Sequence, residues 1–470
     1  MATEVRGMLI EKDFSVFDCD AHVNEPHTIW SDYVEPEYKD IVQAAFWKDE
    51  DFAYLNGRTP VASGTRADLV GRITYNPATI AGPGMGDKRL LRRLQQMRLT
   101  EAQADYLDHK GAWDGAARVP DMDLMGIDQV LVIPTKIINH FVYVENVNGA
   151  YGLARAYNNW VADYCKPSPG RLFGAGILPL QYMAYAVKEI RRMKDMGFPV
   201  ALMRPIDAKN LYPNRIYQGA SDSYRNRGLT MDSVFRTLEE TGVVCGMHTL
   251  PHTSVTGSME TKATMDTPCQ LLHRVTEKDG VRVDQQTMGF IWEGSAWLIQ
   301  VLLSGFFDIY PNIKMAIFET NAAWVLQVLE SCDRAFKLYR NERRVPAKRL
   351  PSEAFRDQCV IGFEADETPV FRLWEQFQDI AIWASDAYHH DGAPAWDALH
   401  LMAKHKVPRE AMVKLMGGNA RRMYGIEPKL FVRHEREIQR PDWFPKKDAA
   451  FEQWWKQEAH PKKQAAARGG

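Results

Sequence analysis

The 470-residue sequence contains no apolar run of the ~18 residues that a membrane-spanning helix requires, so we expect no membrane association. The segment Met1–Asp13 lacks the apolar core of a signal peptide, so we expect no secretion and a cytoplasmic location. Charge of one sign is not in excess, because 58 Lys and Arg oppose 60 Asp and Glu, and nucleic acid is therefore not an expected partner. The six cysteines show no CxxC spacing, which indicates reduced, buried thiols.

The overall composition, with 45% apolar and 25% charged residues, is typical of a globular protein. Eight short apolar segments recur along the chain: Phe14–Asp20, Gln129–Pro134, Leu172–Leu180, Pro199–Pro205, Val243–His248, Lys314–Glu319, Cys359–Phe363 and Ile380–Asp386. Amphipathic helical patterns such as Asn148–Cys165 and Met231–Thr241 lie between most of them. Continuously apolar strands that alternate with helices predict a parallel sheet covered on both faces. The sequence therefore predicts an α/β fold, a closed (β/α)8 TIM barrel.

The predicted barrel spans residues 14–426 and is interrupted after its first strand. Glu35–Asp123 carries few strand signals and many turn signals, so we interpret residues 35–123 as an insertion that is partly helical around Lys88–Tyr106. A second long loop, Leu250–Gly289, follows the fifth strand. Long irregular segments in compact domains are usually functional lids or oligomer arms.

Residues 427–470 form a polar tail that is rich in Arg, Lys, Trp and Pro. Its aromatic residues, including Trp443 and Trp454, indicate that this C-terminal arm packs either on its own barrel or on a neighbouring subunit. We therefore expect a homo-oligomer in which the arm is a contact, or an assembly with a related partner chain.

Ionisable residues gather where the predicted strands end: Asp20 and His22 at the first, His248 at the fifth, Glu319 at the sixth, and Asp386 with His389 at the eighth. Barrel enzymes place catalysis at this face, and residues two apart on a strand point to the same side. Asp, Glu and His supply the oxygen and nitrogen ligands that zinc, manganese and iron accept. The coincidence predicts a site for one or two divalent ions.

Four further residues at or after predicted strands each allow two interpretations. Glu25 could bind the metal or cap a helix, and His252 and His390 could be ligands or ordinary loop residues. Arg204, at the end of the fourth strand, could hold a substrate carboxylate through two parallel hydrogen bonds or form a salt bridge at the barrel rim.

Several stretches, in their order along the chain, resemble the amidohydrolase superfamily. They are the DxDxHxxEP motif of Asp18–Pro26, Asp121–Asp128, Ser304–Pro311, Trp383–Asp386 and Gly418–Gly425. The branch they resemble is the amidohydrolase-related group, which includes aminocarboxymuconate semialdehyde decarboxylase and aromatic acid decarboxylases. The resemblance covers most of the region from Phe14 to Ile426.

This resemblance implies roles for individual residues. Asp20 and His22 would be the first-strand ligands, His248 the fifth-strand ligand, and Asp386 both a ligand and the general base. His389 matches a histidine that often follows this aspartate in the group. Glu319 departs from the group, which commonly has a catalytic histidine there, so we expect it to serve as a catalytic residue or an additional ligand.

The resemblance implies a metal-dependent enzyme that hydrolyses or non-oxidatively decarboxylates a small organic acid or amide, with Asp386 as general base. We expect Glu319 and His389 to be catalytic residues beside it. A second interpretation is a dinuclear iron or iron–manganese monooxygenase on the same ligands, because the candidate ligands exceed the number that one ion needs. A third is a non-catalytic subunit whose barrel supports a partner chain.

Overall fold

The structure is a computed structural model, and it describes residues 9–26, 28–48, 52–55, 59–63, 88–107, 110–135, 137–141, 144, 146–203, 231–249, 288–342, 347–389, 392–437 and 440–459. Across these ranges, no helix combines the length and the apolar character that crossing a membrane would require. The five cysteines within them are free thiols, as predicted; Cys269 lies outside the ranges.

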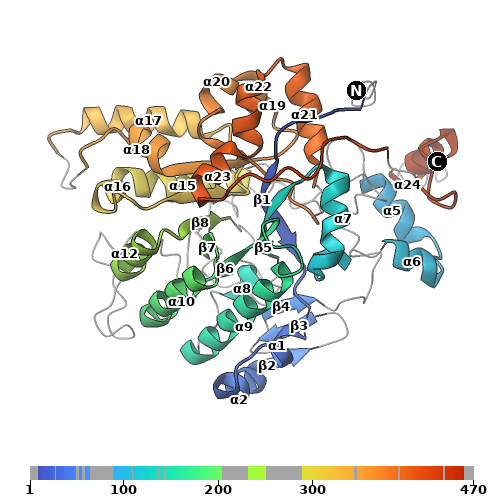
Figure 1. The fold of residues 1–470 in the computed structure, drawn as a ribbon, viewed down its shortest axis with the longest axis horizontal. Coiled ribbons are helices and arrows are strands. Elements are labelled where there is room, and N and C mark those ends of the chain that lie inside the picture. Colours follow the sequence, from blue (N-terminus) through green and yellow to red (C-terminus); the bar gives the residue numbers. More distant parts are fainter. Residues whose placement is uncertain are drawn as a thin grey trace, which may run out of the picture.

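Eight parallel strands form a nearly closed barrel in which each strand neighbours the next one along the chain (Figure 1). They are β1 (Phe17–Val23), β5 (Gln129–Pro134), β6 (Leu172–Ile177), β7 (Val200–Met203), β8 (Val244–His248), β9 (Met315–Phe318), β10 (Cys359–Phe363) and β11 (Ala381–Trp383). The predicted (β/α)8 barrel is confirmed. The strands differ from the predicted segments chiefly at their ends, since β1 continues to Val23 and β11 stops at Trp383.

Side chains alternate between the barrel interior and the layer between strands and helices. Leu131, Val200 and Val244 belong to the interior cluster, whereas Val132 and Ala201 pack with the helices. Both faces of each strand are therefore buried and apolar, which is why the strands appear as continuous apolar runs in the sequence.

The helices that follow the strands cover the outside of the barrel (Figure 1). They are α8 (Ile137–His140), α9 (Val147–Cys165), α10 (Met183–Asp195), α12 (Met231–Thr241), α15 (Phe290–Leu303), α16 (Phe306–Ile309), α17 (Val325–Leu338), α18 (Pro351–Gln358), α19 (Thr368–Arg372), α20 (Trp374–Phe377), α21 (Ala395–Lys404), α22 (Arg409–Val413), a π-helical turn (Lys414–Gly418) and α23 (Asn419–Tyr424). The last of these closes the amino-terminal end of the barrel, because Ala420 and Met423 belong to the interior cluster.

The segment between β1 and β5 holds more strand than the sequence indicated. Its elements are α1 (Ile29–Asp32), α2 (Pro36–Ala45), β2 (Phe46–Lys48), β3 (Phe52–Leu55), β4 (Thr59–Ser63), α5 (Lys88–Gln96), α6 (Glu101–Leu107), a 3-10 turn (Lys110–Ala112) and α7 (Gly115–Met125). The strands β2, β3 and β4 form a small antiparallel sheet. The helices α5 and α6 lie where the sequence indicated a helical part, around Lys88–Tyr106. The three short strands were not predicted, because three to five residues per strand are too few to establish an alternating pattern.

The C-terminal arm packs on this same segment. Its helix α24 (Ala449–Ala459) lies beside α5 and α6 in Figure 1. Leu90, Leu94 and Leu107 form a separate apolar cluster with Phe444 and Phe451 of the arm. An ion pair of 2.9 Å joins Arg89 Nη1 to Glu452 Oε1 at its edge. Within one chain the arm therefore contacts the insertion helices, and its predicted role in an oligomer stays a prediction.

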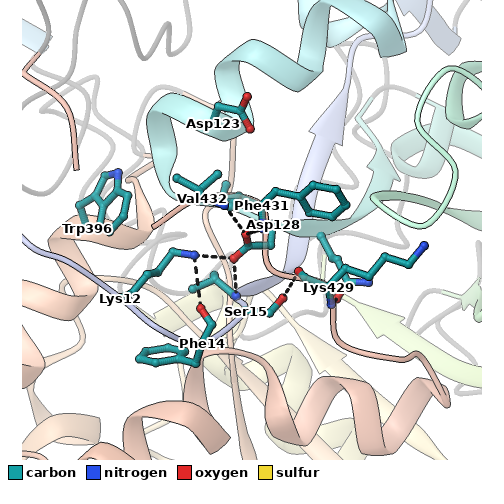
Figure 2. Close-up of polar contacts among 12 residues, drawn as sticks. Lys12, Phe14, Ser15, Asp123, Asp128, Trp396, Lys429, Phe431 and Val432 are labelled. Atoms are coloured by element: carbon teal, nitrogen blue, oxygen red, sulfur yellow. Dashed lines mark hydrogen bonds and ion pairs between the residues drawn. The ribbon is translucent and has the colours of Figure 1, made fainter. Parts of the chain in front are cut away.

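A buried ion pair lies at the amino-terminal face of the barrel, where the segment before β1 meets the beginning of the arm (Figure 2). Lys12 Nζ lies 2.5 Å from Asp128 Oδ2, and the two side chains are 1% and 0% exposed. The same carboxylate accepts hydrogen bonds from the amides of Val16 at 2.8 Å, Phe431 at 2.6 Å and Val432 at 2.8 Å. Asp128 thus joins the segment before β1, the start of β5 and the beginning of the arm.

Candidate metal centre

The six residues that the sequence placed at strand ends come together in the structure. Asp20 and His22 lie in the second half of β1, His248 ends β8, Glu319 follows β9, and Asp386 and His389 follow β11. They converge at the carboxyl-terminal end of the barrel, where parallel barrels place their active sites. Of the other candidates, Arg204, His252 and His390 lie outside the described residues.

The side-chain atoms of these residues approach one another closely. His22 Nε2 lies 3.4 Å from Asp20 Oδ1 and 3.4 Å from Asp386 Oδ1. His248 Nε2 lies 3.7 Å from Asp20 Oδ2 and 3.3 Å from Glu319 Oε2. Two groups of three ligand atoms have all members within 4.8 Å of one another, and they are Asp20 with His22 and His248, and His22 with Asp386 and His389.

The chemistry of this donor set fits a divalent cation. Asp20 Oδ1 and His22 Nε2 are buried and form no hydrogen bond with any part of the chain that the structure describes. Burial, with the neighbouring charge of Asp18, raises the pKa of Asp20, and burial lowers the pKa of His22. A cation stabilises buried carboxylate and imidazole lone pairs that point toward one another and have no hydrogen-bond donor. A mixture of carboxylate and imidazole ligands suits zinc, manganese or iron.

An irregularity in the pairing of β1 turns the side chains of Asp20 and His22 toward the barrel interior. The pairing of β1 with β5 shifts between Asp18 and Ala21. Before the shift, Phe17 and Cys19 belong to the interior cluster; after it, Ala21 and Val23 belong to the outer layer. Asp20 and His22 can therefore face the interior directly after Cys19, because a bulge resets which residues point inward.

The backbone also bends sharply at two of the residues that follow strands. Glu319 has φ 49° and Asp386 has φ 51°, in the left-handed region that side chains other than glycine enter at a cost of about 1–2 kcal/mol. The Thr249 hydroxyl donates to the Glu319 carbonyl at 2.7 Å, and the carboxylate of Glu367 accepts from the Ala322 amide at 2.7 Å. Burial raises the pKa of Glu367 to about 7. These contacts fix the loop that carries Glu319.

The strand that begins the barrel meets the strand that ends it directly beside the candidate ligands. The Asp386 amide donates to the Asp20 carbonyl at 2.9 Å, and the His22 amide donates to the Ala387 carbonyl. Buried Asp18 accepts from the Ser385 hydroxyl at 2.5 Å and from the Ser385 amide at 2.9 Å. Burial raises the pKa of Asp18 to about 6.

Hydrogen bonds beyond the cluster orient two of the candidates. His248 Nδ1 lies 2.7 Å from the Thr249 carbonyl, so this nitrogen carries the proton and Nε2 presents its lone pair to the centre. His389 Nδ1 lies 2.7 Å from Asp386 Oδ1, and its ring stacks on the His22 ring with centroids 3.9 Å apart.

Exposure divides the six residues into two sets. The side chains of Asp20, His22, His248 and Asp386 are at most 7% exposed. The Glu319 and His389 side chains are 15% and 25% exposed. Four of the candidates therefore line the floor of the centre, and Glu319 and His389 lie at its open side.

Glu25 lies apart from this cluster. Its carboxylate is fully buried and accepts hydrogen bonds from the amides of Thr135 at 3.3 Å and Ile137 at 3.2 Å, at the start of α8. Neither group of candidate ligands includes it. Of its two interpretations, these contacts favour the helix cap.

Three residues that support the centre were not predicted from the sequence. Arg118 of α7 donates to the carbonyl of His22, Thr249 donates to the carbonyl of Glu319, and Ser385 donates to the carboxylate of Asp18. No sequence signal marks these three residues as functional. Two of them donate hydrogen bonds to backbone carbonyls, which every residue has, and the third bonds to a residue far away in the sequence. The nearest hint was the position of Ser385 beside Asp386.

Comparison with known proteins gives a family and a common fold. The sequence model of the protein family described as Amidohydrolase matches residues 17–426. An amidohydrolase from Mycobacterium avium subsp. paratuberculosis K-10 has a similar structure, with a TM-score of 0.60 and 18% sequence identity over 88% of this chain and 100% of that one.

Two further similar structures are enzymes solved with bound manganese. One is 5-carboxyvanillate decarboxylase from Novosphingobium aromaticivorans DSM 12444, with a TM-score of 0.56 and 16% identity over 89% of this chain and 100% of that one. The other is a dihydroxybenzoic acid decarboxylase from Polaromonas sp. JS666 that also holds an inhibitor, with a TM-score of 0.53 and 15% identity over 88% of this chain and 97% of that one. At these identities the likeness concerns the fold.

Proposed function

This chain belongs to the amidohydrolase family, and on that premise we propose that its barrel is a metal-dependent carboxy-lyase that removes carbon dioxide from a small organic acid. The observation that carries the proposal is that Asp20, His22 and His248 bring three ligand atoms within 4.8 Å of one another at the carboxyl-terminal end of the barrel, with Asp386 Oδ1 3.4 Å from His22 Nε2. Two structurally similar enzymes are decarboxylases with manganese, which supports the reaction class.

We assign the four buried residues to hold one divalent ion. Two imidazoles and two carboxylates satisfy the three or four protein ligands that a catalytic ion needs while leaving a position for substrate. The two carboxylate charges also neutralise a divalent cation in a site that water barely reaches. The bound ion would supply a Lewis acid that holds the carboxylate or a neighbouring hydroxyl of the substrate.

We assign proton transfer to the two residues at the open side. Loss of carbon dioxide leaves electron density on carbon, which an acid must protonate. The carboxylate of Asp386, 2.7 Å from His389 Nδ1, stabilises the protonated ring, so His389 can deliver this proton. We assign to Glu319, which lies outside both three-residue groups and is 15% exposed, proton exchange with the substrate.

The reaction and its metal can be tested together. We expect protein purified without added metal to contain about one zinc or manganese ion per chain. Chelation should abolish release of carbon dioxide from a panel of hydroxylated aromatic acids, and added Mn²⁺ should restore it. Hydrolysis of amides by the same ion, without carbon dioxide release, would overturn the proposed reaction while leaving the metal centre in place.

A dinuclear oxygenase is the second candidate, because two overlapping groups of ligands share His22 and a further carboxylate, Glu319, lies 3.3 Å from His248. Plasma mass spectrometry separates the two functions. Two ions per chain that include iron, together with substrate-dependent uptake of dioxygen, would establish the oxygenase and refute the carboxy-lyase.

Replacement of Glu319 by Gln distinguishes catalysis from metal binding. We expect the variant to retain its metal, because four other residues hold the ion, and to lose at least ~10²-fold in turnover, because Gln cannot exchange a proton. Metal content and turnover of the same preparation provide the check. A decrease in metal content by one ion per chain would show instead that Glu319 is a metal ligand.

A further inference from the structure

We propose that Arg118 is a positioning residue of the metal centre, which acts by clamping the seam between β1 and the segment after β11. The proposal rests on the proposed function in one respect, namely that the centre binds a divalent ion. It assigns a role to α7 (Gly115–Met125), an element outside the barrel, in holding the two halves of the ligand set in register.

The contacts of Arg118 end on both sides of the seam. Its side chain is buried, and Nη1 donates to the carbonyl of His22 at 2.9 Å. Nη2 donates to the carbonyl of Ala387 at 3.4 Å. One acceptor is the backbone of a candidate ligand, and the other belongs to the residue directly after Asp386. The planar guanidinium can bridge two such acceptors because its donors form a rigid fork.

The seam has fewer backbone hydrogen bonds than a regular pair of strands. Two of them join Asp386 to Asp20 and His22 to Ala387, and the Asp18 carboxylate also accepts from the hydroxyl and amide of Ser385 across the seam. By contrast, β7 and β8 pair along four successive residues. His22 and Asp386 approach across the seam, with Nε2 and Oδ1 3.4 Å apart. A small slip between the two segments would therefore change the distance between the ligand atoms.

The surroundings of Arg118 hold the guanidinium in place without an opposite charge in contact. Arg118 has no carboxylate in direct contact among the described residues, but its charge counteracts the rise in pKa that burial causes in Asp18 and Asp121. Tyr164 Oη accepts from Nη1 at 3.2 Å. The Tyr388 ring lies under the guanidinium, 4.8 Å from its centre to Cζ, and Tyr388 Oη donates to Asp121 Oδ2 at 2.6 Å. The charge is thus stabilised by carbonyls, an aromatic ring and more distant carboxylates, and the hydrogen bonds of the guanidinium reach both sides of the seam.

The helix that carries Arg118 is itself fixed at both ends. Asp114 caps its start by accepting from the amides of Ala116 at 2.9 Å and Ala117 at 3.2 Å. Gly126 ends it with φ 79°, a conformation in which glycine is unstrained. The clamp is therefore mounted on a rigid element, as positioning of metal ligands requires.

Arg171 provides a matched control at the opposite end of the barrel. It is also a buried arginine that donates to backbone carbonyls, those of Asp128 at 3.0 Å and Ile127 at 2.9 Å, and it pairs with Asp123 at 2.8 Å. Its removal should lower stability without touching the seam. Comparison of the two arginines separates positioning of the metal centre from general stabilisation.

The test measures Mn²⁺ affinity by electron paramagnetic resonance, which counts free Mn²⁺, at a temperature well below the melting point of each variant. We expect R118M to weaken Mn²⁺ binding about 10–100-fold, as loss of an outer partner of a metal ligand does. R118K should also weaken it, by a smaller factor, because a single ammonium cannot bridge both carbonyls. R171M should melt at a lower temperature and bind Mn²⁺ within about twofold of the wild type.

Affinity in R118M equal to that in R171M would overturn the proposal. If R118M does not fold, R118K decides by the same criterion, and wild-type affinity in R118K overturns it. Failure of the proposed function looks different, because the wild-type protein itself would then bind no divalent ion.

Discussion

The variant Asp386→Asn is expected to lose at least ~10³-fold in turnover and to keep its fold. The loss follows from two contacts, because Asp386 Oδ1 lies 3.4 Å from His22 Nε2 and 2.7 Å from His389 Nδ1. The amide of asparagine is neutral, so it binds a cation more weakly and cannot stabilise a protonated His389. The fold should survive because asparagine has the same shape and tolerates the left-handed backbone at φ 51°.

Steady-state turnover, metal content and thermal melting of the same preparation check this expectation. Asp379→Asn is a suitable control, because Asp379 is a surface residue that pairs with Lys414 at 2.7 Å, away from the centre. Near-native turnover in Asp386→Asn would remove Asp386 from the catalytic residues. Melting far below the control would show that the substitution damages the fold and not only the chemistry.

The variant Asp128→Asn should lose about 3–5 kcal/mol in free energy of unfolding, because it leaves the Lys12 charge buried without its partner. Burial already lowers the pKa of Lys12, with the charge of Asp128 acting in the opposite direction. The amides of Val16, Phe431 and Val432 would also exchange a charged acceptor for a neutral one. Chemical denaturation measures the change.

The comparison that isolates the charge is the double variant Lys12→Met/Asp128→Asn, which should recover part of the loss because it removes the unpaired ammonium. Asp163→Asn is the exposed control; its pair with Lys166 lies at the surface, so we expect a change below about 1 kcal/mol. Equal losses in Asp128→Asn and Asp163→Asn would contradict the importance of the buried pair.

The sequence predicted the barrel because both faces of its strands are buried. Segments such as Cys359–Phe363 are apolar throughout, and the structure reproduces this strand with the same bounds. The ends of strands were predicted less well where polar residues of the centre interrupt the pattern. β1 continues through Asp20 and His22 to Val23, although polar residues in a sequence usually mark the end of a buried strand.

The candidate centre was predictable because its residue types are distinctive and recur at strand ends. What supports it was not predictable from the sequence. Arg118 acts on backbone carbonyls, which every residue possesses, and Lys12 and Asp128 are 116 positions apart. The bulge in β1 was also missed, because it arises from the shift in pairing with β5 and not from a glycine or proline in β1.

The seam between the first and last strands has a consequence for how the protein is made. Asp18 and Ser385, which bond across it, are 367 positions apart. At ribosomal rates of about 5–20 residues per second, Asp20 and His22 exist for some tens of seconds before Asp386 is synthesised. A nascent chain or a fragment that ends before β11 has only part of the ligand set. On the proposed assignment, the ion therefore meets its full ligand set only after Asp386 has been synthesised and the barrel has closed.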